Sequence, residues 1–187
     1  MTARKRSPLT ELKIVIFGAG KIGRSFIGQV FSKAGYEVVF VDVDASLTKA
    51  LSKAGWYRVV VKGAETDEII TISPVRALSL RDAQQVVREL ADASLAACCV
   101  GQKGIPAVIP LFAEGLLLRR KEFGNLPMDL ILAENLRNAD LEVRKQLACC
   151  LPGDYPLDSL VGLVETSIGK MVPIMTRRDQ EEDPLQV

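Results

Sequence analysis

A glycine-rich turn near the start of the chain constrains the fold more than any other feature. It reads Gly18-Ala19-Gly20-Lys21-Ile22-Gly23 and lies between an apolar run at 13–17 and a stretch whose apolar residues have helical spacing. A second apolar run then ends in Asp42, 24 positions after Gly18. This order of strand, G-x-G-x-x-G, helix, strand and acid, with roughly 20 residues to the acid, is typical of dinucleotide-binding units. The sequence therefore predicts a Rossmann-type domain that holds NAD.

Each part of the turn has an expected role at a pyrophosphate. Gly18 permits the tight turn, Gly20 lets the backbone approach the ligand, and Gly23 lets the helix pack against the strand. Backbone N–H groups at the helix N-terminus would donate to the pyrophosphate, and the helix dipole favours an anion there. The predicted cofactor-binding residues are Gly18, Ala19, Gly20, Lys21, Ile22 and Gly23. A glycine-rich turn in an unrelated α/β protein is the alternative.

Asp42 is the predicted acceptor for the hydroxyl groups of the adenosine ribose. Its charge would repel a 2′-phosphate, so the sequence favours NAD over NADP. Two nearby cations, Lys21 and Arg24, would weaken that preference. An aspartate at a strand end that only caps the next helix is the alternative.

The rest of the chain alternates strands with helices, which predicts a doubly wound, mainly parallel sheet with helices on both faces. Runs at 57–61 and 68–72 interrupt the alternation and predict an antiparallel ribbon as an insertion. Pro110 would kink the helix around it or delay its start. The expected strands are 13–17, 37–42, 95–100, 128–132 and 160–164, and the expected helices are about 22–34, 45–54, 83–90, 105–116 and 138–149.

Composition and length limit the domain organisation and the partners. The 187 residues suit one domain, and we expect a polar tail at 1–12, the dinucleotide-binding domain at 13–175 and a linker or frayed terminus at 176–187. A net charge of +1 gives no reason to expect nucleic acid as a partner. No apolar stretch is long enough to suggest a membrane span or a signal peptide, so a cytoplasmic protein is expected.

Cysteine and histidine usage narrows the chemistry. The cysteines form two adjacent pairs, Cys98-Cys99 and Cys149-Cys150, without C-x-x-C spacing, so no metal site is expected. They are predicted to be small core residues in a reducing compartment. The chain has no histidine. A dehydrogenase contained in these residues would therefore use Lys, Tyr, Cys or a carboxylate as its base.

Three polar residues follow late strands, where parallel sheets face their ligands. Asn135 comes just after the strand at 128–132, and its amide could donate to a substrate carbonyl oxygen and to the alkoxide it becomes. An ordinary turn residue is the alternative for Asn135. Glu165 and Lys170 follow the last strand, with solvated surface charge as their alternative.

Several of these segments also resemble the mannitol-1-phosphate 5-dehydrogenases, a family of polyol-specific long-chain dehydrogenases. The resemblance covers about 13–175. It is carried by 17–28, by Val100-Gly101 with Pro106 and Pro110, by Ala133-Glu134-Asn135, by 162–173 and by the ribbon insertion. It implies NAD-dependent interconversion of mannitol 1-phosphate and fructose 6-phosphate. It also implies that Asn135 is the catalytic oxyanion donor and that Gly101 lies at the cofactor.

The chain departs from the family pattern in two respects. Lys21 and Ser25 stand where the family motif usually carries Asn and Gly. The family's base is a Lys in a K-x-x-x-x-N-x-x-H motif on a second, helical domain, and this chain has no histidine. The resemblance therefore implies the cofactor half of a dehydrogenase, with the C-terminal helical catalytic domain absent and the fragment inactive alone.

Two other functions stay open. One is a related polyol or hexuronate dehydrogenase, and the other is a non-catalytic NAD-binding regulatory module. A cofactor half would expose a surface that a second domain normally covers, so we expect an apolar patch near 172–175 and self-association through it.

Overall fold

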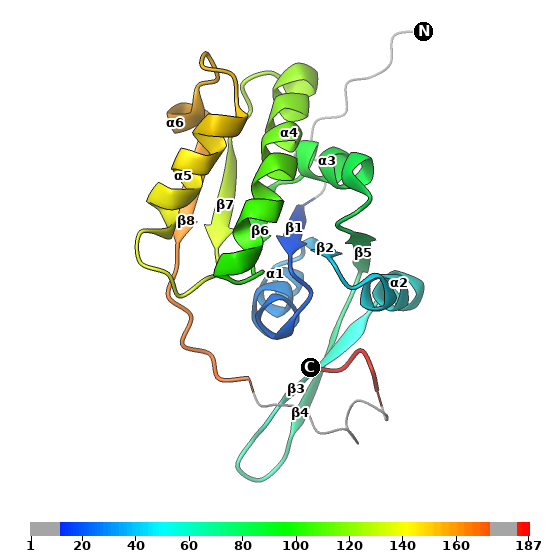
Figure 1. The fold of residues 1–187 in the computed structure, drawn as a ribbon. Coiled ribbons are helices and arrows are strands. Elements are labelled where there is room, and N and C mark those ends of the chain that lie inside the picture. Colours follow the sequence, from blue (N-terminus) through cyan, green and yellow to red (C-terminus); the bar gives the residue numbers. More distant parts are fainter. Residues whose placement is uncertain (1–11, 173–182) are drawn as a thin grey trace, which may run out of the picture.

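A six-stranded parallel sheet forms the centre of the molecule (Figure 1). The computed structural model describes residues 12–172 and 183–187. The strands are β1 (Lys13–Phe17), β2 (Glu37–Asp42), β5 (Val75–Ser79), β6 (Leu95–Cys98), β7 (Met128–Leu132) and β8 (Val161–Glu165), in the order β5-β2-β1-β6-β7-β8. The strand order reverses between β1 and β6, which is where open α/β sheets bind ligands. The predicted Rossmann-type fold is confirmed.

The two faces of the sheet have separate cores because successive side chains on a strand point in opposite directions. Val15 and Phe17 face one core, and Ile14 and Ile16 face the other. The first core contains α3 (Ala83–Ala91), α4 (Ile105–Phe123) and α5 (Ala139–Cys150). The second core contains the π-helix η1 (Gly23–Gly28), α1 (Gln29–Lys33) and α2 (Ala45–Ala54). The short element η2 (Gln102–Gly104) precedes α4, and the short helix α6 (Leu157–Leu160) precedes β8.

The predicted antiparallel ribbon is present as β3 (Tyr57–Val61) and β4 (Glu68–Ile72), and it projects away from the sheet in Figure 1. Its base packs on the second core through the fully buried Tyr57. Val187 lies at the end of the segment expected to be a linker or a frayed terminus, but it is hydrogen-bonded to β3. Val187 donates its N–H to the Arg58 carbonyl and accepts from the Val60 N–H, at 3.0 and 2.8 Å, so the backbone of β3 holds it. The rest of the predicted linker, and most of the polar tail at 1–12, lie outside the described residues.

The structure differs from the sequence analysis at three further places. Strand β5 was missed because an edge strand needs no continuous apolar run, and its sequence VRALS has none. Helix α4 begins at Ile105 with Pro110 inside it, which excludes a delayed start, one of the two effects expected of Pro110. Cys149 and Cys150 are exposed at the end of α5, so their expected core position is wrong, whereas Cys98 is buried as predicted.

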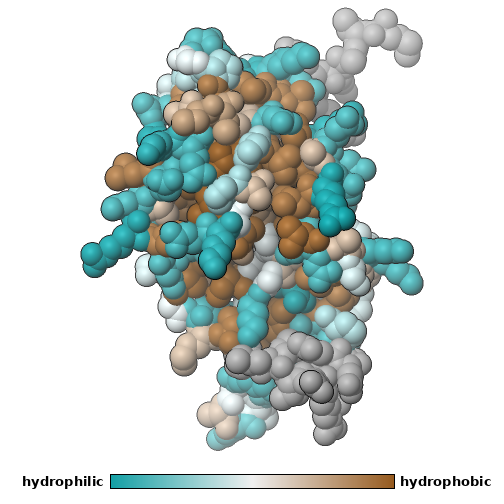
Figure 2. Space-filling model, viewed as in Figure 1, coloured by the Kyte–Doolittle hydropathy of each residue, from teal (hydrophilic) through white to brown (hydrophobic). Residues whose placement is uncertain are grey.

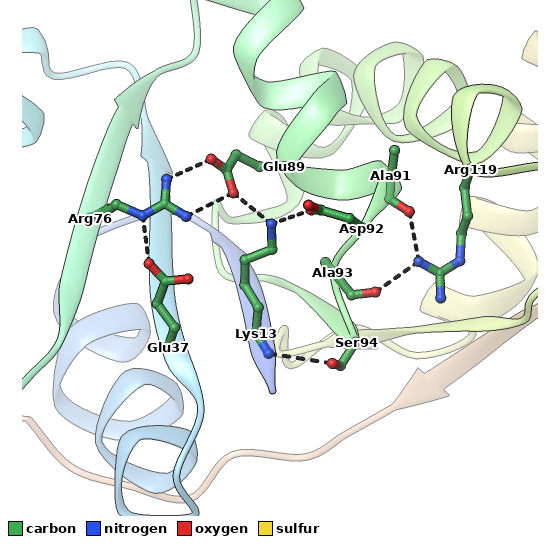
Figure 3. A network of polar contacts seen from close by, with 9 residues as sticks. All are labelled: Lys13, Glu37, Arg76, Glu89, Ala91, Asp92, Ala93, Ser94 and Arg119. Atoms are coloured by element: carbon green, nitrogen blue, oxygen red, sulfur yellow. Dashed lines mark hydrogen bonds and ion pairs between the residues drawn. The ribbon is translucent and has the colours of Figure 1, made fainter. Parts of the chain in front are cut away.

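Buried and half-buried charges fix the amino edge of the sheet (Figure 3). Arg119 on α4 is 2% exposed and donates to the carbonyl oxygens of Ala91, Ala93, Leu126 and Pro127 at 2.8–3.0 Å. Beside it, an ion network joins β1, β2, β5 and α3 through Lys13, Glu37, Arg76, Glu89 and Asp92. These contacts hold the strands in register at the end opposite the predicted site.

Candidate functional site

The glycine turn directly follows the carboxyl end of β1, and its backbone conformation is one that requires glycine at position 18. Gly18 has a φ of +94°, a conformation that side chains disfavour, and its N–H donates to the Val41 carbonyl at 2.8 Å. A Cβ on Gly18 would overlap the carbonyl oxygen of Cys99. The turn is thus wedged between the ends of β2 and β6, at the point where the strand order reverses.

Gly20 and Gly23 are required for different reasons. A Cβ on Gly23 would overlap the Gly18 carbonyl oxygen, so only glycine lets η1 lie this close to the strand end. A Cβ on Gly20 would meet no atom of the described residues within 4 Å, and the φ of Gly20 is not positive. Packing within the described part of the chain therefore does not require a glycine at position 20. The open space there fits a ligand that approaches the backbone, such as a pyrophosphate.

Asp42 contacts the same turn. Its Oδ2 accepts the Ala19 N–H at 2.6 Å, and its Oδ1 accepts the Asp44 N–H at 2.9 Å. The cap of α2 is Asp44, whose carboxylate accepts from Ser46 and Leu47, so the alternative of Asp42 as a helix cap is not what the structure shows. A carboxylate has about four acceptor positions, so Asp42 keeps capacity for ribose hydroxyl groups.

The two cations expected beside Asp42 take different positions. Lys21 is exposed at the start of the helix. Arg24 is only 9% exposed, and its Nε donates to the Ala19 carbonyl at 2.7 Å. Burial lowers the pKa of Arg24, and electrostatic interactions with Tyr57, Asp42 and Asp183 act in the opposite direction. Arg24 therefore points into the protein, a placement that sequence reasoning missed.

The loops after β6 and β7 are joined by a carboxylate. The Gly101 N–H donates to Glu134 Oε1 at 2.6 Å, and Gly101 has a φ of +74°. Burial raises the pKa of Glu134, while hydrogen bonds from the Gly101 and Val100 backbone lower it. Sequence reasoning quoted Glu134 in a motif but gave it no role. Its position beside Asn135, just past a strand end, was the available signal.

Asn135 pairs with the segment that follows β8. Its Nδ2 donates to the Ile168 carbonyl at 3.1 Å, and its Oδ1 accepts the Ile168 N–H at 2.8 Å. Thr166 fixes the same segment by donating to the Leu132 carbonyl at 2.8 Å. One hydrogen of the Asn135 amide is not used by this pair, because an amide nitrogen carries two. Asn135 thus holds the segment and keeps one donor.

The other two polar residues are brought to neighbouring positions. Lys170 Nζ donates to the Ser25 carbonyl at 2.6 Å and to Gln29 Oε1 at 3.1 Å, so it ties the segment after β8 to the helix that follows the glycine turn. Glu165 accepts the Asn138 N–H at 3.0 Å. Lys170 is half-buried with two partners, so a merely solvated charge does not describe it, whereas Glu165 is exposed and the surface-charge alternative still fits it.

A groove of about 660 Å³ adjoins these loops, between the start of α4 and the loop that leads into α5. Apolar side chains such as Ile105 and Leu136 line it beside the charged side chains of Arg137, Glu142 and Lys145. Figure 2 shows polar and apolar side chains interspersed over the face that carries these helices. The groove thus offers apolar contact and charges of both signs next to the carboxyl edge.

The buried thiol of Cys98 and the half-buried thiol of Cys99 do not offer a nucleophile at this edge. Burial raises the pKa of Cys98 to about 12, and it raises that of Cys99 as well. Both thiols are therefore neutral near pH 7. Within residues 12–172 and 183–187, no three Cys, Asp or Glu side chains lie where they could hold a metal ion together. None of the helices in that part of the chain combines the length and apolarity needed to cross a bilayer.

Comparison with known proteins gives one family and a common fold. The family model for the mannitol dehydrogenase Rossmann domain matches residues 12–187. A mannitol-1-phosphate 5-dehydrogenase of Geobacillus thermodenitrificans (strain NG80-2) is 32% identical over 180 residues, which are 94% of this chain and 45% of that relative. This chain thus spans about half the length of that relative.

Among solved structures, octopine dehydrogenase with NADH and L-arginine matches with a TM-score of 0.59 at 15% identity, over 81% of this chain and 34% of that one. Octopine dehydrogenase in complex with NADH and agmatine gives 0.58 at 13% identity, over the same shares of the two chains. At these identities the likeness concerns the fold alone.

Proposed function

The chain belongs to the mannitol dehydrogenase Rossmann-domain family, and from this we propose that it is the NAD-binding half of an oxidoreductase that interconverts mannitol 1-phosphate and fructose 6-phosphate. The position of the glycine turn at the point where the strand order reverses is the observation that carries the cofactor assignment. Space that the described residues leave open at Gly20 supports it. The relative that is 32% identical, a mannitol-1-phosphate 5-dehydrogenase, supports the choice of substrate.

The turn residues would bind the cofactor as follows. The backbone N–H groups from Gly20 to Gly23 would hold the pyrophosphate at the start of the helix. Ala19 would keep the turn in place through its N–H bond to Asp42, whose carboxylate would also accept from the ribose hydroxyl groups. The nicotinamide, when bound, supplies the hydride acceptor or donor for the hydroxyl-bearing carbon. Gly101 would lie beside it, held by Glu134. These roles favour NAD over NADP, because Asp42 would repel a 2′-phosphate.

Asn135 is the proposed donor to the substrate oxygen. Its pair with Ile168 fixes the amide plane, and the remaining hydrogen can meet a carbonyl oxygen or the alkoxide formed from it. In this proposal, the base that accepts the proton of the substrate hydroxyl group is not among these 187 residues. We therefore expect the chain to bind NADH without oxidising mannitol 1-phosphate, and NAD⁺ reduction by the isolated chain would contradict this.

The thiols and the exposed apolar end of the domain bear on two further proposals, the cellular location and self-association. The four thiols are free, as is usual in a reducing compartment, so we place the protein in the cytoplasm. Met171 is 92% exposed at the described end of the segment after β8, while 173–175 lie outside the described residues. Self-association through this apolar end is proposed, and a concentration-independent monomer in sedimentation would contradict it.

Two glycine substitutions test the cofactor site. Gly20→Ala adds a methyl group in open space, so it should leave stability unchanged while weakening NADH binding at least tenfold, because the methyl group takes the place of the ligand. Gly153→Ala is the matched control: its Cβ also meets no atom within 4 Å, but it lies in the loop before α6 at the other edge of the sheet. Calorimetric titration gives both affinities. Equal NADH affinity for wild type and Gly20→Ala would refute the assignment.

A further inference from the structure

Both hydrogen-bonding groups of Ala19, the central residue of the Gly18-Ala19-Gly20 turn, are held by side chains. The Ala19 N–H donates to Asp42 Oδ2 at 2.6 Å, and the Ala19 carbonyl accepts from Arg24 Nε at 2.7 Å. Ala19 itself is fully buried. The orientation of the turn is therefore set by one carboxylate and one guanidinium group on opposite sides of a single residue.

Arg24 also reaches the C-terminal residues of the chain. Its NH1 donates to the Leu185 carbonyl at 2.7 Å, although the two residues are 161 positions apart. Its own carbonyl accepts from the hydroxyl group of Tyr57, on β3, at 2.7 Å. With two guanidinium nitrogens bound to backbone carbonyls and 9% of its surface exposed, Arg24 faces the protein and not a ligand.

The C-terminal segment (residues 183–187) is in turn anchored to the ribbon. Val187 pairs with the backbone of β3, and Asp183 Oδ2 lies 3.4 Å from the Arg58 guanidinium. Asp183 Oδ1 accepts the Leu185 N–H at 3.0 Å, so it holds the residue whose carbonyl group Arg24 binds. A continuous set of contacts thus runs from the ribbon through 183–187 and Arg24 to the turn.

We infer that Arg24 is a positioning residue that couples the C-terminal segment and the β3–β4 ribbon to the cofactor turn. The inference rests on the proposed function, because it concerns how the turn is held for its ligand. A turn fixed in advance loses less freedom when a pyrophosphate binds, so loosening residues 183–187 weakens binding from a distance. In this inference Arg24 has no part in discriminating NAD from NADP, since its Nε and NH1 bind backbone carbonyls within the protein and the residue is only 9% exposed.

The test combines two substitutions and their double variant. Arg24→Met should weaken NADH binding about tenfold, in line with the loss of charged hydrogen bonds to Ala19 and Leu185. Asp183→Ala should weaken it about threefold, although Asp183 does not touch the turn. The double variant should bind no worse than Arg24→Met, because both changes act through one route. Asp154→Ala, an exposed aspartate in the loop before α6, is the control and should change nothing.

Two further readouts separate positioning from other roles. NADPH binding should fall in proportion to NADH binding in Arg24→Met, whereas a changed ratio would mean that Arg24 contacts the ligand and would overturn the inference. Amide exchange at Ala19 should speed up in Asp183→Ala at unchanged melting temperature. Unaltered Ala19 exchange and NADH affinity in that variant would also overturn it. If wild type binds neither nucleotide, the proposed function fails, and the exchange result still decides the coupling.

Discussion

Glu89 lies at the centre of the ion network at the amino edge of the sheet (Figure 3). Its carboxylate accepts from Arg76 at 2.5 and 2.9 Å and from Lys13 at 2.7 Å, so it links α3 to β5 and β1. Burial alone would raise the pKa of Glu89, but the hydrogen bonds and charges of Arg76 and Lys13 outweigh burial and lower it from 4.5 to about 2. We therefore expect Glu89→Gln to destabilise the protein in a pH-dependent way.

The magnitude follows from the two pKa values. A folded-state pKa below the unfolded one stabilises the protein above about pH 4.5, and this stability is lost as the pH falls towards 2. The full difference corresponds to about 3 kcal/mol at pH 7. The side chain of Arg76 is 42% exposed, so solvent screens part of the interaction. We expect a loss of about 1–2 kcal/mol, or about 2–8 °C in melting temperature.

Urea denaturation of wild type and Glu89→Gln at pH 7, 5.5, 4 and 3 measures this directly. The difference in unfolding free energy should stay constant down to about pH 5 and shrink below it. Glu122→Gln, which changes an exposed glutamate on α4, is the control and should show no difference. A Glu89→Gln difference of the same size at pH 7 and pH 3, or none at pH 7, would refute the reasoning.

Three further substitutions test the packing through the unfolding free energy in urea. Gly23→Ala should cost about 2–4 kcal/mol, because its Cβ would overlap the Gly18 carbonyl oxygen; a stable variant would show that the helix can shift freely. Ser25→Ala should stabilise by about 0.5–1 kcal/mol, since the buried Ser25 hydroxyl has no hydrogen-bond partner among the described residues; destabilisation would mean that the hydroxyl is satisfied. Arg119→Met should cost about 3 kcal/mol or more, because four backbone carbonyls lose their donor; a cost below about 1 kcal/mol would show that water replaces the guanidinium.

The sequence was informative where the determinants are local. Neighbouring residues specify the backbone conformation of the turn from Gly18 to Gly23. The same holds where α1 and α2 end, at Gly35 and Gly55, both of which have a positive φ. The alternation of apolar runs identified the parallel sheet, because buried strands are apolar on both faces. Strand β5 was not predicted, because a strand at the edge of the sheet need not be apolar on both faces.

The contacts that orient the site could not be predicted, because they join residues far apart in the chain. Arg24 was expected near the ribose end of the cofactor. Its side chain instead points into the protein, where it donates to the carbonyl of Leu185, 161 positions away. Asn135 was assigned a role in chemistry, and its pairing with Ile168 depends on where the segment after β8 runs. Cys149 and Cys150 look like core residues in sequence, yet they sit on the outward side of α5 at its end.

Calorimetric titration of the 187-residue chain with NADH, and with NADPH in parallel, tests the central claim most directly. Saturable NADH binding that is tighter than NADPH binding is predicted, because Gly20 leaves space for the pyrophosphate and Asp42 disfavours a 2′-phosphate. Absence of binding to either nucleotide, or tighter binding of NADPH, would contradict the account.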